Sequence, residues 1–419
     1  MRLFKICRIE RFFKQLNSNL YALPLTSLKY MNILFPTNTY YLQSQKGRLS
    51  MKGEITHRQE GVRKLMGSGG FDALVLSSAE NIQYFTGAAE PSIHACGSVI
   101  IPLNGQSVLA VMWLDKEAAV EEAKEVSVQV YTPDTQGKVI TKTLQRFGVE
   151  KGVIGMDDLA SEYLGNSLKR SLTEAELVDA TETVEGLRSV KSEEEIRFIR
   201  KACEISVEGM RVALKSLKPG ITELEVAAIA EHHMIKLGSD TMKHDIIVAS
   251  GFRTRLLHAF ATQKKIERGD LVSIDLGSVY HGYCSDIARS FVFGNRAGEL
   301  KNAFDILRAA QDEVLKELRP GVSIKELESA ALKAARSSGH KLIGFVGHSI
   351  GLQVEEHPRL QSAGSSHPDL KIEKDMVVAF FQGSIQAKSN SGIRLEDTVL
   401  ITESGAEMLT VYPRELFSD

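Results

Sequence analysis

The chain is poor in cysteine and lacks both a long apolar run and an excess of charge of one sign. Its four cysteines form no Cys-x-x-Cys pair, which argues against a disulfide framework or a structural zinc site. No apolar run reaches the roughly 18–20 residues that a membrane helix needs. A net charge of −2 supplies no positive field for nucleic acid. We therefore expect a cytoplasmic protein that has neither a membrane nor a nucleic acid as partner.

The remaining composition is that of a globular protein, with 43% hydrophobic and 25% charged residues. A length of 419 residues predicts two domains, which we place at residues 51–185 and 186–415. Residues 1–50 differ, because they hold eight Lys or Arg residues and a single acid, Glu10. This segment is either a poorly ordered extension ahead of a true start at Met51, or an organelle transit peptide.

Residues 51–185 show an α/β pattern. Two β-rich runs, Ser98–Pro102 and Ser107–Trp113, flank Asn104-Gly105, which predicts a hairpin. A long helix over Arg188–Gly209 follows, with Ser192 and Glu195 in capping-box spacing. We place the domain boundary just before it, at Thr181–Arg188.

The second domain contains an internal repeat. The segment LKPGIT (217–222) recurs as LRPGVS (318–323), 101 residues later. Each copy opens an amphipathic helix with Thr222 or Ser323 at its N-cap, ends near a glycine (Gly238 or Gly339), and is followed by a strand-rich stretch. This favours duplication over chance similarity and predicts a pseudo-twofold domain of mixed α/β (α+β) class, with a site between the halves.

A pair of carboxylates stands out in this domain. Asp275 and Asp286 belong to two β-rich runs, Leu271–Leu276 and Cys284–Phe291, around a glycine-bounded turn. A hairpin brings such residues to one end of a sheet, and buried like charges repel unless a cation lies between them. The other candidates are His258, His348 between two glycines, and Glu396. Each alone has an ordinary structural explanation, but together three carboxylates and an imidazole suit Mn²⁺, Co²⁺, Fe²⁺ or Mg²⁺.

Six motifs give the chain a resemblance to the creatinase, prolidase and methionine aminopeptidase superfamily, in the two-domain form of Xaa-Pro peptidases. They are NIQYFTG from residue 81, LRSVKSEEEIRFIRKA from 187, GDLVSIDLG from 269, YCSDIARSF from 283, GHSIGL from 347 and GIRLEDTVLIT from 392. The resemblance implies a creatinase-like N-terminal domain, a C-terminal "pita-bread" domain, and a homodimer whose N-terminal domain helps to close the neighbouring active site.

The resemblance also implies a metal site. Asp275 would ligate one of two ions, Asp286 and Glu396 would bridge both, and His348 would bind the other. The family's fifth ligand, a glutamate, is Phe381 here, and an expected histidine is Glu355. A third departure is Ser349 in place of the family's usual glycine.

These departures leave one well-held ion, Mn²⁺ or Co²⁺, and a second site that is weak or empty. His258 would donate a proton or a hydrogen bond to the reacting centre, and Glu355 would replace the lost base or ligand.

Three functions stay open on this basis. The first is an Xaa-Pro dipeptidase- or aminopeptidase-like metallohydrolase that cleaves a C–N bond of a small peptide. The second is a hydrolase or lyase acting on a small non-peptide metabolite, which the altered pocket at Phe381, Gln382 and Glu355 motivates. The third is a non-catalytic binding protein on a peptidase fold.

Overall fold

The computed structural model describes residues 39–157, 162–240, 245–294, 297–336, 342–343, 346–361, 369–380, 384–386 and 392–419. The chain divides into two units, Met1–Ser50 and Met51–Asp419. The second unit contains the residues of both predicted domains and is described below. No helix among the described residues is long and apolar enough to span a membrane.

The first part of this unit is built on one six-stranded mixed sheet in the order β4-β3-β2-β1-β5-β6. The predicted hairpin is confirmed, because β2 and β3 pair antiparallel and Gly105 takes a φ of 109° in the turn. The strands are β1 (Ala73–Leu76), β2 (Ser98–Pro102), β3 (Ser107–Met112), β4 (Val126–Tyr131), β5 (Val153–Met156) and β6 (Glu176–Asp179).

Helices pack against this sheet on apolar side chains, and two buried clusters cover its two faces. Successive residues of a strand point to opposite faces, so Leu74 and Leu76 enter one cluster while Ala73 and Val75 enter the other. The helices are α2 (Thr39–Gly69), α3 (Ala79–Thr86), α4 (Pro91–Cys96), α5 (Lys116–Glu122), α6 (Gln136–Arg146) and α7 (Glu162–Ser171).

The predicted long helix over Arg188–Gly209 is wrong at its beginning. Two helices occupy the region, α8 (Thr181–Ser189) and α9 (Glu193–Ser216). Between them Val190 forms an isolated β-bridge with Met376, which holds the backbone extended and interrupts the helix. The capping box itself is confirmed: Ser192 accepts from the Glu195 amide, and Glu195 accepts from the Ser192 amide.

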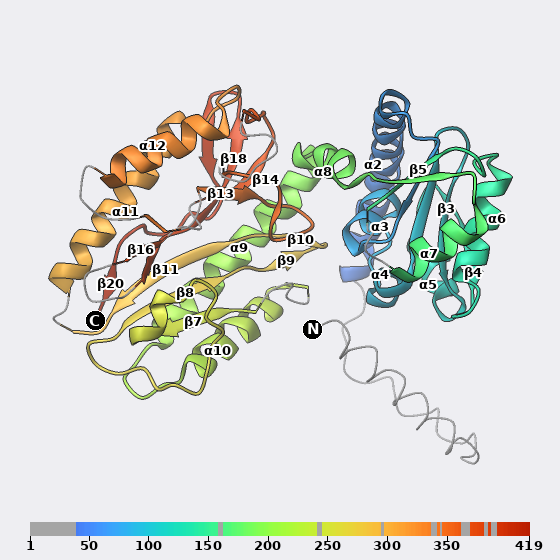
Figure 1. The fold of residues 1–419 in the computed structure, drawn as a ribbon. Coiled ribbons are helices and arrows are strands. Elements are labelled where there is room, and N and C mark those ends of the chain that lie inside the picture. The colour runs from blue at the N-terminus through green and yellow to red at the C-terminus, as the bar shows by residue number, and fades with distance from the viewer. Residues whose placement is uncertain are drawn as a thin grey trace, which may run out of the picture. The chain divides into compact units, whose positions relative to one another are not determined.

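The second part contains several small sheets with paired helices outside them (Figure 1). One sheet runs β20-β11-β8-β7 and another runs β14-β13-β15-β18-β19. The helices are α10 (Glu223–Lys236), α11 (Ala297–Glu317) and α12 (Ile324–Arg336). The strands of the two sheets are β7 (Ile247–Ser250), β8 (Leu271–Leu276), β11 (Ile287–Val292), β13 (Gly347–Ser349), β14 (Glu356–Arg359), β15 (Val377–Phe380), β18 (Asp397–Thr402), β19 (Gly405–Met408) and β20 (Phe417–Ser418).

The internal repeat recurs as structure. In the first copy the Gly220 amide donates to the Ile266 carbonyl, and the Ile266 amide donates to the Ile221 carbonyl, both at 2.8 Å. The predicted N-caps are present too: Thr222 and Ser323 each accept from the amide three residues ahead. Gly339 lies outside the described residues. The second copy repeats both backbone bonds, again at 2.8 Å, through Gly321, Val322 and Ile372.

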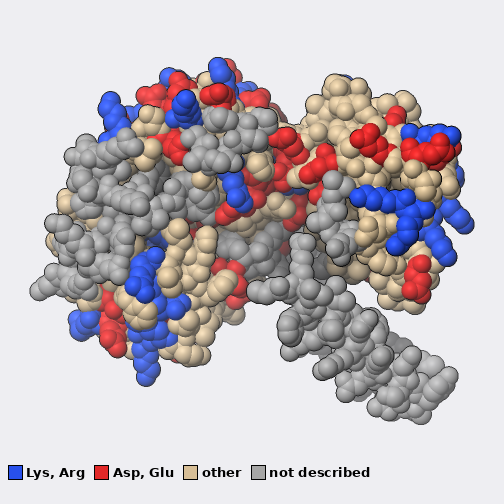
Figure 2. All heavy atoms as spheres, viewed as in Figure 1, with Lys and Arg blue, Asp and Glu red and all other residues tan. Residues whose placement is uncertain are grey.

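The surface carries both signs of charge in close mixture. In the view of Figure 2, blue and red side chains occur over each part of the described chain, and neither colour covers a whole face. This distribution agrees with the net charge of −2.

Candidate metal centre

Three of the predicted ligands meet in the second part of the unit. Asp286, His348 and Glu396 are all buried, and one ligand atom from each lies within 4.8 Å of the others. His348 Nε2 is 4.0 Å from Asp286 Oδ2 and 3.9 Å from Glu396 Oε1. His348 lies 62 residues after Asp286, and Glu396 lies 48 residues after His348, so only the folding of the strands brings the three together.

Strand pairing fixes the two carboxylate-bearing segments. The predicted antiparallel pairing is confirmed for β8 and β11, with Asp275 opposite Ala288. The predicted run Cys284–Phe291 is wrong as a single strand, because Cys284 ends β10 (Tyr283–Cys284) and Asp286 lies just before β11. Glu396 lies just before β18, and its amide and carbonyl both bond to Ala288 at 3.1 Å. Thr398 then holds Asp286 on both sides, accepting from its amide at 3.0 Å and donating to its carbonyl at 2.8 Å. The backbone therefore presents Asp286 from the position before β11 and Glu396 from the position before β18, and the bridge between Ala288 and Glu396 joins the two segments.

The imidazole of His348 is oriented by its own strand. Its Nδ1 lies 3.1 Å from the carbonyl oxygen of Ser349, which can only accept, so Nδ1 carries the proton. The lone pair is then on Nε2, the nitrogen that faces Asp286 and Glu396. Burial lowers the pKa of His348, which favours the neutral, ligand-competent form.

Electrostatics favours a cation at this position. Burial, followed by repulsion from Glu396 and Asp275, raises the pKa of Asp286 well above its usual range. Burial and then Asp275 do the same to Glu396. Within the described chain, Asp286 Oδ1 and Glu396 Oε1 are buried and accept no hydrogen bond. A hard divalent ion would neutralise the carboxylates and use these oxygens, so the residues present fit a metal.

The fourth predicted ligand, Asp275, has a different principal partner. Its charge helps to raise the pKa of Asp286, so it borders the cluster, but it is not among the three converging ligands. Its Oδ2 is in contact with Nη1 of Arg394, and both side chains are buried. Arg394 thus supplies a positive charge beside three buried carboxylates. Sequence reasoning missed this residue, which ends β17 (Gly392–Arg394) two positions before Glu396.

The other two predicted site residues lie outside the cluster. His258 is exposed, in the connection that follows the short helix η2 (Gly251–Arg255). Glu355 is partly exposed, with 32% of its side chain accessible, and pairs with Arg359 at 3.2 Å. Phe381 and Gln382 lie outside the described residues, so the interpretation of Phe381 as a lost ligand stays a prediction.

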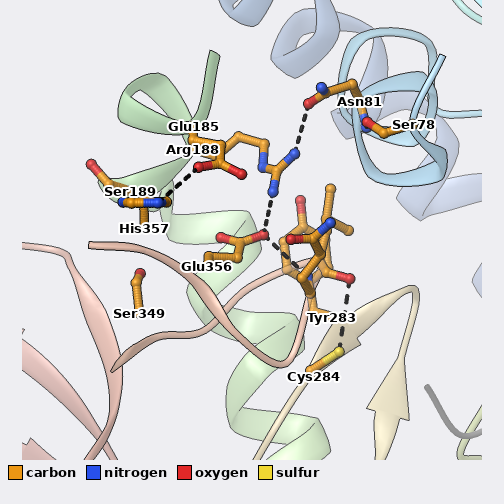
Figure 3. Close-up of polar contacts among 12 residues, drawn as sticks. Ser78, Asn81, Glu185, Arg188, Ser189, Tyr283, Cys284, Ser349, Glu356 and His357 are labelled. Atoms are coloured by element: carbon orange, nitrogen blue, oxygen red, sulfur yellow. Dashed lines mark hydrogen bonds and ion pairs between the residues drawn. The ribbon is translucent and has the colours of Figure 1, made fainter. Parts of the chain in front are cut away.

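A buried polar network beside the centre was also missed. Arg188 in α8 donates to Asn81 of α3 at 2.6 Å and to Glu356 of β14 at 2.9 Å (Figure 3). Lys191 reaches the same glutamate at 3.5 Å. Arg188 and Lys191 both belong to the LRSVKSEEE motif. Their shared partner, Glu356, lies more than 160 residues away, and no spacing in the sequence predicts that contact.

Comparisons with known proteins agree with this geometry. Residues 197–403 match metallopeptidase family M24, and residues 58–190 match the creatinase/prolidase N-terminal domain. An Xaa-Pro dipeptidase of Pyrococcus furiosus is 33% identical over 364 residues, which cover 86% of this chain and 100% of that protein.

Solved structures give the same result. The prolidase of Pyrococcus horikoshii superposes with a TM-score of 0.77 at 31% identity, covering 86% of this chain and 99% of that one. An X-Pro aminopeptidase of Thermotoga maritima gives 0.76 at 30% identity, with the same coverage.

The fold and the site thus define a two-domain metallohydrolase. The chain belongs to metallopeptidase family M24, with a creatinase/prolidase-type N-terminal domain, and the resemblance and fold class predicted from its motifs are confirmed. It is accordingly a metal-dependent peptidase, and the metal used by this family is divalent.

Proposed function

We propose that the chain is an Xaa-Pro dipeptidase or aminopeptidase that cleaves the bond before proline in small peptides. The observation that carries this proposal is the convergence of Asp286, His348 and Glu396 on one buried point. Relatives named as Xaa-Pro peptidases, matched over nearly their full length, support the substrate class.

Asp286, His348 and Glu396 would hold one well-bound ion, Mn²⁺ or Co²⁺, with Asp275 at its edge. Such an ion supplies Lewis-acid chemistry, because it polarises a carbonyl group and makes a water molecule more acidic. Two carboxylates and a neutral imidazole match the donor preference of these metals. Since Asp275 is also paired with Arg394, a second ion would compete with that contact, and we expect the second site to be weak or empty.

The chain's own residues have distinct roles in this proposal. Arg394 contacts Asp275, offsets its negative charge and so holds this carboxylate in place. His258 is exposed on its loop and can donate a hydrogen bond to the peptide carbonyl oxygen. Glu355, charged opposite Arg359, can accept a proton from the attacking or leaving group once that ion pair opens.

The loop that carries His258 is well anchored. Glu223, which is fully buried, accepts from the amides of Ser250 and Thr262 at 2.8 and 3.1 Å, one at each end of the loop. Near the loop's middle, Gly392 lies so close that a side chain on it would meet the Thr254 carbonyl at 2.3 Å. The loop is therefore held at fixed points while His258 stays accessible.

We further propose a homodimer located in the cytoplasm.

The purified protein, stripped with a chelator and reloaded with Mn²⁺ or Co²⁺, tests the function on Xaa-Pro dipeptides, with Xaa-Ala dipeptides as the comparison. We expect release of proline that depends on the ion and is lost in Glu396→Gln. Metal binding without cleavage of any Xaa-Pro peptide would contradict the peptidase and favour a non-peptide amide substrate. An absence of both metal and cleavage would favour a binding protein.

A further inference from the structure

Ser349 connects the metal centre to the segment between α8 and α9. Its carbonyl oxygen accepts from Nδ1 of His348, so its backbone sets the imidazole tautomer. Its hydroxyl lies 2.9 Å from Nζ of Lys191 and 3.3 Å from the Val377 carbonyl. Ser349 is completely buried. One residue therefore touches His348 through its main chain and Lys191 through its side chain.

Lys191 is buried to an unusual degree for a lysine, with 1% of its side chain exposed. Its ammonium group has three acceptors: the Ser349 hydroxyl, the Ser189 carbonyl at 3.1 Å and Glu356 Oε2 at 3.5 Å. An ammonium group has three protons, so its hydrogen-bonding capacity is filled. A buried charge with a full set of partners is held in one place.

The backbone of Lys191 is also fixed on both sides. Its amide donates to the Asp375 carbonyl at 2.9 Å, and Ser192 directly after it caps α9. Before it, Val190 bridges Met376, the residue that precedes β15. Strand β15 pairs with β13, with Ser349 opposite Val378. Lys191 and Ser349 are thus set against each other by the same stretch of sheet.

Glu356 completes the arrangement. It accepts from Arg188 at 2.9 Å and from the Gln353 amide at 3.1 Å, and Figure 3 shows Arg188 between Glu356 and Asn81. Two buried cations therefore share one buried carboxylate. Arg188 makes the shorter contact with Glu356, and Lys191 lies farther from this carboxylate, at 3.5 Å. The shortest contact of the Lys191 ammonium group is therefore the one to the Ser349 hydroxyl, at 2.9 Å.

We propose that Lys191 is a positioning residue for His348, acting through Ser349. The ammonium group holds the Ser349 hydroxyl, this fixes the peptide unit whose carbonyl binds His348 Nδ1, and the Nε2 lone pair is thereby aimed at Asp286 and Glu396. The proposal rests on the proposed metal-binding function and adds a residue to it. It assigns to the segment between α8 and α9 a part in metal affinity, although that segment contributes no ligand.

Removing the direct hydrogen-bond partner of a ligating imidazole typically changes metal affinity 10- to 100-fold, because that partner orients the ligand and raises its basicity. Lys191 acts one contact further out, so we expect Lys191→Met to weaken Mn²⁺ binding by about 10-fold, the lower end of that range. Ser349→Ala removes the same contact from the other end and should weaken binding within the same range. Because both changes break one contact, the double variant should bind about as weakly as the weaker single variant.

The experiment measures Mn²⁺ and Co²⁺ binding to the full chain by isothermal titration calorimetry, with the visible absorption of bound Co²⁺ as a report of ligand geometry. Ser107→Ala is the matched control. Ser107 is also completely buried and also binds a cation, since Arg63 donates to its hydroxyl at 2.9 Å, but it lies on β3 away from the metal ligands. We expect this control to keep the wild-type affinity and spectrum.

The outcomes separate cleanly. Unchanged Mn²⁺ affinity and an unchanged Co²⁺ spectrum in folded Lys191→Met would overturn the proposal, as would losses that multiply in the double variant. If Lys191→Met does not fold, Ser349→Ala decides, because it leaves the contacts of Lys191 with Ser189 and Glu356 in place. A wild-type chain that binds neither ion overturns the proposed function itself, and this inference with it.

Discussion

The buried ion pair between Arg188 and Glu356 should matter far more to stability than a better-aligned pair on the surface. Arg188 is 3% exposed and Glu356 is 3% exposed, and their nearest atoms are 2.9 Å apart. Arg188→Met removes one partner while the other stays buried. Such a change typically costs about 3–5 kcal/mol, because a charge is left without its counter-ion.

The structure places the expected cost near the lower end of that range. After the substitution Glu356 keeps the Gln353 amide at 3.1 Å and Lys191 at 3.5 Å, so it is not wholly unpaired. Asn81 loses its donor to Oδ1 but keeps its bond from Nδ2 to Asp157 at 2.8 Å. We expect the free energy of unfolding to fall by about 3 kcal/mol.

Arg200→Met is the matched control. Arg200 binds both carboxylate oxygens of Glu407, at 2.6 and 2.7 Å, but the two side chains are 41% and 44% exposed. Water screens such a pair, and its loss should cost less than about 1 kcal/mol. Urea denaturation followed by circular dichroism and by fluorescence of the single tryptophan, Trp113, measures both variants. Equal losses in the two variants, or a loss below about 1 kcal/mol for Arg188→Met, would refute the reasoning.

The same pair has a pH signature. Burial raises the pKa of Glu356, but Arg188 and Lys191 outweigh it, so the pKa lies below the ordinary value of 4.5. A lowered pKa contributes stability that is complete above the unfolded value and is lost as the pH falls through the folded value. The stability difference between wild type and Arg188→Met should therefore shrink as the pH is lowered below 4.5.

Three further predictions concern the centre and its loop. Glu396→Gln should weaken Mn²⁺ binding at least about 10-fold in calorimetry while the chain stays folded, since burial and Asp275 already disfavour the charged form; unaltered binding would remove Glu396 from the ligand set. Phe381→Glu should raise the Mn²⁺ content by one ion per chain, measured by elemental analysis, and an unchanged count would mean that Phe381 does not occupy the ligand position. Glu223→Gln should lower the free energy of unfolding by about 2 kcal/mol, because it weakens several buried bonds of the His258 loop at once. Glu225→Gln at the exposed cap should have a clearly smaller effect.

Local sequence patterns predicted the elements, and the ordered motifs predicted the fold. Features that depend on a few neighbouring residues were predicted correctly, because alternation, turn residues and capping spacing act over short distances. They are the antiparallel pair β8 and β11, the turn at Asn104-Gly105 and the capping box at Ser192. The break between α8 and α9 was not legible. It depends on a bridge from Val190 to Met376, and nothing near Val190 in the sequence signals a strand so distant.

The site divides in the same way. Asp286, His348 and Glu396 were found from motifs, and the structure brings them together. The contact between Asp275 and Arg394 was not predicted, because the two residues are 119 positions apart and meet only after the strands that carry them pack together. The contacts of Lys191 belong to this second kind. Polar residues that act through one another leave no periodic trace in a sequence.

The pair of backbone hydrogen bonds that recurs in both halves of the second domain, which we call the clasp, has a consequence for how the two halves differ. Its bonds use backbone atoms only, through Gly220 and Ile266 in one half and Gly321 and Ile372 in the other. The side chain of the residue after each cap is therefore unconstrained by the clasp. In one half it is Glu223, the anchor of the His258 loop, and in the other it is an aliphatic core residue, Ile324. Because the clasp uses main-chain atoms alone, the two halves share one backbone arrangement while their side chains differ in chemistry.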